Sequence, residues 1–306
     1  MADLHAGLPA DPLSLAGRSA LVTGAGAGLG RAEALALAAA GARVVVNDYD
    51  PAAADQVVGE IVALGGEAVA APGDVADWAV AEGLVGTAVS AFGQLDILVN
   101  NAGVLRDRTI FNISEAEWDT VLAVHLKGHA ATSRFATAHW RDRSKAADAP
   151  VYARVINTSS EAFLYGSGGQ PNYAAAKAGI TALTLSIHNA CGRYGVKANV
   201  ICPRARTAMT AAVFGAAPEG DDVLSADKVA PLVAFLAAPA AEAISGQVFV
   251  AYGAMIALAG PPELEKRFDA SGPVWTGPDL QGALGSYFAD RDPAATFIAS
   301  DFYALS

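Results

Sequence analysis

The chain has 306 residues, 53% of them hydrophobic and 17% charged, which is enough to bury a substantial core in one large domain. Its formal net charge of −11 at pH 7 excludes an overall electrostatic attraction to nucleic acid or to an anionic membrane surface. Two cysteines, Cys191 and Cys202, are too few for a disulfide framework, so we interpret them as buried thiols in a reducing compartment.

The N-terminal residues 1–17 lack the basic start and the apolar run of a signal peptide. The most apolar stretch, residues 32–46, is interrupted by Gly41 and Arg43, which is typical of a helix, a turn and a strand rather than a membrane span. We therefore expect a cytoplasmic protein that binds neither membranes nor nucleic acid.

Apolar, strand-like runs alternate with segments of helical length. We expect strands at residues 19–24, 43–48, 67–71, 94–101, 153–160, 196–203 and 246–253. Helices are expected between them, at residues 28–40, 51–64, 77–91, 114–141 and 172–193. The strands are continuous Val, Ile and Leu runs, as in strands covered on both faces. This order predicts an α/β fold, a single Rossmann-like, doubly wound sheet of seven parallel strands.

A glycine-rich turn, TGAGAGLG, follows the first predicted strand and opens a helix. Glycine lets the backbone turn tightly and approach a pyrophosphate, whose charge the helix N-terminus attracts. We therefore place a dinucleotide phosphate against this turn, at Gly24, Gly28, Leu29 and Gly30.

The second predicted strand ends at Asp48, about 20 residues beyond these glycines. An acidic residue there hydrogen-bonds the adenosine ribose and repels a 2′-phosphate, which favours NAD over NADP. A solvated turn is the alternative interpretation. After the third strand, Asp74 and Val75 are positioned to meet the adenine, although an isolated Asp is more often a helix cap.

Tyr173 and Lys177 stand four residues apart in an alanine-rich helix, within PNYAAAKAG. Side chains with this spacing are neighbours, with Cβ atoms roughly 6 Å apart. An adjacent ammonium group lowers the pKa of a phenol by favouring phenolate. From these residues alone, an ordinary surface pair is an equally good interpretation.

Together, these patterns resemble the short-chain dehydrogenase/reductase family. TGAGAGLG matches its TGxxxGxG, NNAG ends the fourth strand, and NYAAAK supplies its YxxxK. Ser160 lies thirteen residues before Tyr173, the usual spacing, and the resemblance covers roughly residues 15–258. It implies that Tyr173 is the general acid/base, that Lys177 holds the nicotinamide ribose, and that Ser160 hydrogen-bonds the substrate oxygen. It further implies that NAD is also lined by Asn101, Ala102, Gly103 and Thr207, and that no metal is involved.

Two positions depart from the family pattern. The fourth catalytic position, usually asparagine, is His125 in VHLKG. In the family its main-chain carbonyl holds a relay water, a role that survives the change. We favour a core histidine that maintains the helix geometry over one that relays protons. Arg204 replaces the glycine usual after the sixth strand, which suggests a different loop course.

The segments around His125, Tyr173 and residues 245–258 are similar to one branch of the family, the dehydrogenase part of the peroxisomal multifunctional enzyme. That similarity implies NAD-linked interconversion of a secondary alcohol and a ketone on a bulky apolar substrate, a 3-hydroxyacyl-CoA or a 17β-hydroxysteroid. Four arginines at strand ends would suit a CoA phosphate. Local ion pairs are the more favoured interpretation for them: Arg106, Arg108, Arg204 and Arg206.

Three other functions stay open. A non-catalytic NAD-sensing protein would need no proton-transfer group, and an epimerase or dehydratase would show a TGxxGxxG turn. A dehydrogenase of the same family acting on an unrelated alcohol is the third. We expect an NAD-binding domain at residues 1–260 and a C-terminal extension at 261–306, over the active site or a subunit interface. Family members are usually homotetramers or homodimers, and we expect the same here.

Overall fold

The computed structural model describes residues 11–210, 214–293 and 295–299. Residues 1–10, part of the N-terminal segment that is not expected to be a signal peptide, lie outside the described residues. These residues build one eight-stranded sheet in the order β3-β2-β1-β4-β5-β6-β7-β8. The strands are β1 (Ser19–Val22), β2 (Arg43–Val46), β3 (Ala68–Ala70), β4 (Ile97–Asn100), β5 (Ala153–Thr158), β6 (Val196–Pro203), β7 (Val248–Tyr252) and β8 (Met255–Leu258).

The predicted seven parallel strands are present, but the prediction of a wholly parallel, seven-stranded sheet is wrong by one strand. β8 pairs antiparallel with β7, with Tyr252 opposite Met255. The turn between them contains Gly253 at φ +53°, a left-handed conformation that glycine adopts without strain. The chain thus reverses after β7 and adds a short edge strand.

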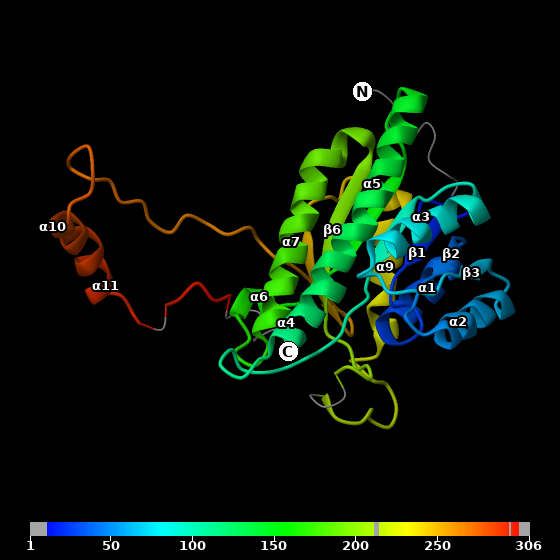
Figure 1. The fold of residues 1–306 in the computed structure, drawn as a ribbon, viewed down its shortest axis with the longest axis horizontal. Helices are drawn as coiled ribbons and strands as arrows, with labels where there is room; N and C mark the ends of the chain where they lie inside the picture. The colour runs from blue at the N-terminus through cyan, green and yellow to red at the C-terminus, as the bar shows by residue number, and fades with distance from the viewer. Residues whose placement is uncertain (1–10, 211–213, 294, 300–306) are drawn as a thin grey trace.

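The helices cover both faces of the sheet (Figure 1). They are α1 (Gly28–Ala39), α2 (Pro51–Ala63), α3 (Trp78–Phe92), α4 (Glu115–Leu122), α5 (Gly128–Ala147), α6 (Ala162–Tyr165), α7 (Pro171–Cys191), α9 (Ala230–Ala237), α10 (Gly277–Leu280) and α11 (Ser286–Ala289). The single helix predicted at 114–141 is α4, a π-helical turn and α5, which continues to Ala147. Helices α6 and α9 were not predicted.

Alternate residues of each central strand enter two separate hydrophobic cores. Val22 packs with α1, α2 and α9 on one face, whereas Leu21 packs with α3, α5 and α7 on the other. Ile97 and Leu98 of β4 divide in the same way. Burial on both faces explains why the strands read as continuous apolar runs. None of the helices in the described part of the chain is long and apolar enough to cross a membrane.

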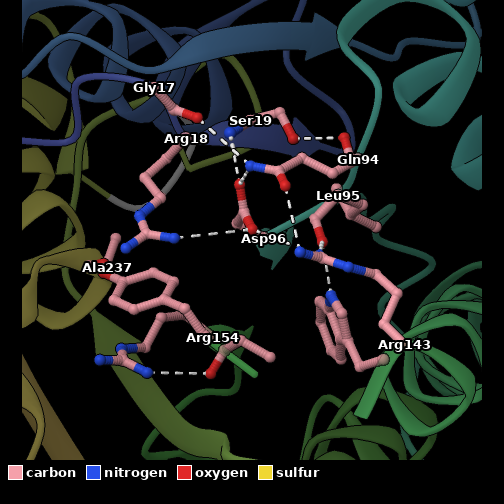
Figure 2. A network of polar contacts seen from close by, with 12 residues as sticks. Gly17, Arg18, Ser19, Gln94, Leu95, Asp96, Arg143, Arg154 and Ala237 are labelled. Atoms are coloured by element: carbon pink, nitrogen blue, oxygen red, sulfur yellow. Dashed lines mark hydrogen bonds and ion pairs between the residues drawn. The ribbon is translucent and has the colours of Figure 1, made fainter. Parts of the chain in front are cut away.

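A buried carboxylate ties together the amino ends of the central strands (Figure 2). Asp96 Oδ2 accepts hydrogen bonds from the Ser19 backbone N–H (3.0 Å) and from Gln94 (2.7 Å). Arg143 and Arg18 place their guanidinium groups 3.4 and 4.0 Å from Oδ1. A buried charge is tolerated only when it is paired and hydrogen-bonded, and Asp96 meets both conditions. This network fixes the end of the sheet opposite the one at which ligands bind in such folds.

The segment after β8 leaves the body of the molecule, carries α10 and α11 away from it, and returns towards α6 (Figure 1). At the end of the described chain, the Ala299 N–H donates to the Leu164 carbonyl of α6 (3.1 Å). The extension therefore returns to its own chain next to the loop that carries Ser160.

Candidate active site

The phosphate-binding turn fits a dinucleotide because its backbone leaves no room for side chains. Gly24 and Gly28 have φ of +61° and +55°. A Cβ at Gly24 would lie 2.7 Å from the Ala102 Cα, and one at Gly30 would overlap the Gly24 carbonyl oxygen. The close approach of these backbones keeps the start of α1 open to a phosphate group.

Asp48 lies beside the same turn. Its Oδ2 accepts a hydrogen bond from the Gly26 N–H (2.9 Å), and its Oδ1 accepts from the Asp50 N–H (3.0 Å). A Cβ at Gly26 would lie 2.8 Å from Oδ2. The carboxylate is therefore fixed at the mouth of the phosphate turn while the residue remains partly exposed.

Asn101 and Thr207 approach the turn from two other loops. The Asn101 side-chain amide donates to the carbonyls of Thr23 (3.2 Å) and Gly24 (3.1 Å). The Thr207 methyl group would lie 3.1 Å from a Cβ at Gly28. Asn101 thus holds the turn by bonding to the turn's carbonyl groups, and Thr207 packs beside Gly28.

Asp74 and Val75 follow β3; Asp74 is exposed and Val75 is buried. Asp74 Oδ1 accepts from the Ala76 N–H (2.9 Å), so this side chain caps a turn, whereas Asp77 caps α3. Val75 lies so close to the start of α5 that a Cβ at Gly128 would be 2.8 Å from its Cγ2. Leu29 packs on the core that contains α1 and α9.

The structure brings Tyr173 and Lys177 together, as their spacing predicts. Lys177 Nζ lies 5.3 Å from the centre of the Tyr173 ring and donates a 2.6 Å hydrogen bond to the Thr158 carbonyl. The Ser160 side chain acts on the Tyr173 hydroxyl so as to lower its pKa, which favours the phenolate. Ser159 Oγ donates to the Lys177 carbonyl (2.8 Å), which locks α7 to the end of β5.

The pKa of Tyr173 is raised, whereas the sequence predicts that its neighbour Lys177 lowers it. Desolvation raises the pKa of Tyr173 to about 12, more than the Ser160 hydrogen bond lowers it. Desolvation lowers the pKa of Lys177 to about 7, since a buried ammonium has lost its hydration. Desolvation, the largest cause, thus outweighs what the neighbouring side chains contribute to the pKa of Tyr173.

His125 is buried in the π-helical turn (Ala123–Lys127), and its ring stands perpendicular to that of Tyr173 at 5.3 Å. Its Nε2 lies 2.8 Å from the Val104 carbonyl oxygen and 3.0 Å from the Val104 nitrogen. Burial holds the pKa of His125 well below its usual value, so the ring is neutral at neutral pH. The ring is buried as in the predicted core histidine, but its Nδ1 has no hydrogen-bond partner among the described residues. π-helical turns occur frequently at functional sites.

Three of the four arginines at the strand ends form local ion pairs, as favoured by the sequence interpretation. Arg108 pairs with Glu117 (3.3 Å) and Arg206 with Asp222 (2.9 Å). Arg204 pairs with Glu161 (2.6 Å). The fourth, at position 106, donates to the carbonyl of the preceding residue (2.7 Å).

Several residues of the site were missed by the sequence interpretation. The lysine's acceptor, Thr158, contributes only a main-chain carbonyl, which no side-chain pattern reveals. Asn172 anchors the start of α7 by donating to the carbonyls of Arg106 (3.1 Å) and Glu117 (3.3 Å). Its position directly before Tyr173, at the start of a helix, was the available signal. His129, in the first turn of α5, is also buried near Lys177, and burial lowers its pKa to about 3.

Comparison with known proteins identifies the family. The short chain dehydrogenase model matches residues 18–216, about two thirds of the chain. The chain belongs to the short chain dehydrogenase family. The family resemblance given by the sequence motifs is confirmed.

Named relatives agree with this assignment. Hydroxyacyl-CoA dehydrogenase ChsB1 of Mycobacterium tuberculosis is 56% identical over 94% of this chain and 93% of its own length. The mouse peroxisomal multifunctional enzyme type 2 is 41% identical over 80% of this chain, which spans 33% of that protein. A crystal structure of a short chain dehydrogenase from Mycobacterium avium superposes with a TM-score of 0.84 at 46% identity, covering 93% of this chain and 99% of that one.

The chain is therefore an enzyme, an oxidoreductase acting on CH–OH groups, of the branch that includes the multifunctional enzymes. Members of this family use a nicotinamide cofactor and act on small molecules. The glycine turn and the loops that close on it fit such a cofactor.

Proposed function

We propose that the protein is an NAD-dependent dehydrogenase that interconverts a secondary alcohol and a ketone on a bulky apolar substrate, a 3-hydroxyacyl-CoA thioester. The observation that carries the cofactor choice is the Asp48 carboxylate, hydrogen-bonded to Gly26 at 2.9 Å beside the phosphate turn. A carboxylate there accepts hydrogen bonds from a ribose and repels a 2′-phosphate. The named hydroxyacyl-CoA dehydrogenase relative supports the thioester over a hydroxysteroid.

The proposed chemistry assigns each catalytic residue one task. A nicotinamide cofactor, held by the glycine turn and Lys177, would supply the hydride acceptor for the alcohol carbon and, when oxidised, a positive charge near the phenol. Tyr173, as phenolate, takes the hydroxyl proton, and Ser160 holds the same oxygen by a hydrogen bond. Lys177 holds the ribose and, when charged, stabilises the phenolate. Burial holds the pKa of Tyr173 at about 12. Tyr173 therefore acts as a base only when the positive charges of Lys177 and of the oxidised nicotinamide lower that pKa.

Three further assignments belong to this proposal. The neutral ring of His125 keeps the π-helical turn and Gly103 in place beside the nicotinamide and does not exchange protons. The cofactor-binding domain ends near residue 260, and the extension from 261 covers the substrate side, which its contact with Leu164 supports. The enzyme acts in the cytoplasm as a homotetramer or homodimer.

The test supplies purified protein with NAD⁺ or NADP⁺ and, for each, a 3-hydroxyacyl-CoA series and a 17β-hydroxysteroid. Reduced cofactor is followed by its absorbance. We expect turnover of the thioesters with NAD⁺ and a loss of at least about a hundredfold in Tyr173→Phe, the usual contribution of a general acid/base. Tight NAD⁺ binding without turnover of any alcohol would favour the sensing function or an unrelated alcohol. A preference for NADP⁺ would overturn the role given to Asp48.

A further inference from the structure

The residue that follows Ser160 is held by a two-point ion pair. Arg204 donates from Nε to Glu161 Oε2 (2.6 Å) and from Nη2 to Oε1 (2.8 Å). Parallel bonds of this kind fix both the distance and the orientation of the two planar groups. The Glu161 side chain is 9% exposed and that of Arg204 is 24% exposed, so the pair is largely removed from water.

The pair joins three strand ends at the ligand-binding side of the sheet. Glu161 leads from β5 into α6, and Arg204 follows β6. The Arg204 N–H donates to the Ala251 carbonyl of β7 (3.0 Å), and its guanidinium lies 4.9 Å from the ring centre of Tyr252. The position of Ser160 is thereby tied to β6 and β7, although Ser160 itself belongs to the end of β5.

Stability does not explain such a pair well. Removing two charges from water costs about as much as their attraction returns, so an apolar pair of similar size would serve a merely structural purpose. Two features connect this pair to the chemistry instead. Glu161 is adjacent to Ser160, whose hydroxyl accepts from the Ala162 N–H (3.2 Å) and lowers the pKa of Tyr173.

We propose that the Glu161–Arg204 pair positions Ser160 and selects substrates by charge. Each of its ions satisfies the other, so the pair presents no uncompensated charge beside the reacting carbon. A carboxylate near that carbon therefore finds no countercharge at this pair to replace its lost hydration, whereas a neutral acyl thioester needs none. The inference deepens the proposed function, on which it rests: the site accepts the thioester and rejects the free 3-hydroxy acid.

The test compares two substrates of equal chain length, chosen as the length that the wild type turns over best as a CoA thioester. One is the free 3-hydroxy acid, and the other is its neutral N-acetylcysteamine thioester. The measured quantity is the ratio of kcat/KM for the acid to kcat/KM for the thioester, with NAD⁺. This ratio cancels general losses of activity, which a merely structural role would cause equally for both substrates.

Single substitutions are expected to move the ratio in opposite directions. Glu161→Gln leaves the Arg204 cation uncompensated and is expected to raise the ratio by about tenfold, which corresponds to about 1.4 kcal/mol. Arg204→Gln leaves the carboxylate uncompensated and lowers the ratio. The double substitution removes both charges and is expected to restore the ratio to within about threefold of the wild type. Its kcat stays reduced because Ser160 is no longer anchored.

Two further variants separate position from charge. Arg204→Lys keeps the charge but loses the fork, so it is expected to lower kcat for both substrates and to leave the ratio unchanged. The matched control is Glu242→Gln, which removes a carboxylate paired with Arg154 and Lys197 near the opposite ends of β5 and β6. It is expected to leave the ratio unchanged. If Glu161→Gln does not fold, Arg204→Gln tests the ratio by itself.

The inference fails if the wild type turns over the thioester and neither single substitution alters the ratio. It also fails if Glu161→Gln and Arg204→Gln shift the ratio in the same direction. If the wild type turns over no thioester, the proposed function fails instead. The pair is then judged by the Kd of the free 3-hydroxy acid, measured by calorimetry with NAD⁺ present. That Kd must decrease in Glu161→Gln, and an unchanged value overturns the inference.

Discussion

The imidazole of His125 packs directly against Gly103, so closely that a Cβ on Gly103 would overlap Cε1 and lie 3.1 Å from both ring nitrogens. The contact joins the loop after β4 to the π-helical turn. The Gly103 backbone is not in a left-handed conformation. Glycine is therefore required at this position by the closeness of the His125 ring and not by the backbone conformation. A histidine at the position usual for asparagine and a glycine in NNAG form one structural unit.

Gly103→Ala is expected to destabilise the protein by about 1–3 kcal/mol, the usual cost of an overpacked site. His125→Ala in the same chain removes the overlap, so the double variant is expected to lose less stability than the two single losses added together. Urea denaturation of the four proteins measures this coupling. Gly59→Ala is the control, because Gly59 lies in α2 with no atom within 4 Å of an added Cβ. Simple additivity would contradict the contact.

The charge of Asp48 and its hydrogen bond to Gly26 are separable. Asp48→Asn keeps an oxygen that accepts from Gly26 but removes the charge that would repel a 2′-phosphate. We expect the ratio of kcat/KM with NAD⁺ to kcat/KM with NADP⁺ to fall by about tenfold, the size of one moderate charge repulsion. Asp50→Asn is the matched control, because Asp50 caps α2 by accepting from Ala52. An unchanged ratio in Asp48→Asn would remove Asp48 from cofactor selection.

Glu33 of α1 is fully buried, and its carboxyl oxygens have no hydrogen-bond partner among the described residues. Burial raises the pKa of Glu33 from 4.5 to about 8. Between pH 4.5 and 8 the folded protein binds a proton that the unfolded chain has released, so this group lowers the free energy of unfolding as pH rises.

Glu33→Gln is therefore expected to match the wild type in stability near pH 4 and to exceed it at pH 7 by roughly 3 kcal/mol. Glutamine has the size and polarity of the protonated carboxyl group, so the comparison isolates the charge. Denaturation at pH 4, 5.5 and 7 gives the difference directly. A difference that does not grow with pH would mean that the carboxyl group is paired or hydrated in solution.

The sequence predicted those features of the site that are written in local patterns. The glycine turn, the acidic end of β2 and the Tyr173–Lys177 spacing each involve side chains that are close in the chain. β8 was missed because its four residues carry no pattern of their own and are defined by pairing with β7. The partner of Arg204 was missed because Glu161 is 43 residues away, although an ion pair was expected.

The direction of the Tyr173 pKa shift was also beyond the sequence. The spacing gives the distance to Lys177 but not the direction of its ammonium group, which the Thr158 carbonyl determines. Nor does spacing reveal desolvation, which is the largest cause of the shift for both residues. Burial and main-chain acceptors depend on the assembled sheet, and local patterns contain neither.

The contribution of Lys177 to the free energy of unfolding is expected to increase with pH. Burial lowers its pKa from 10.5 to about 7. Between these values the unfolded chain binds a proton that the folded protein does not, so the free energy of unfolding rises with pH. The ionisation of Glu33 acts in the opposite direction up to about pH 8, so the wild type alone does not reveal either group.

Lys177→Met removes this contribution, because methionine keeps an unbranched chain without a charge. The stability of the wild type minus that of the variant is expected to increase by about 2 kcal/mol from pH 7 to 8.5. Chemical denaturation at half-unit steps measures it, and the two cysteines, present in both proteins, cancel in the difference. A constant difference would show that Lys177 stays charged in the folded protein, held by the Thr158 carbonyl. In that case Lys177 would be a stronger electrostatic partner for Tyr173 than its burial indicates.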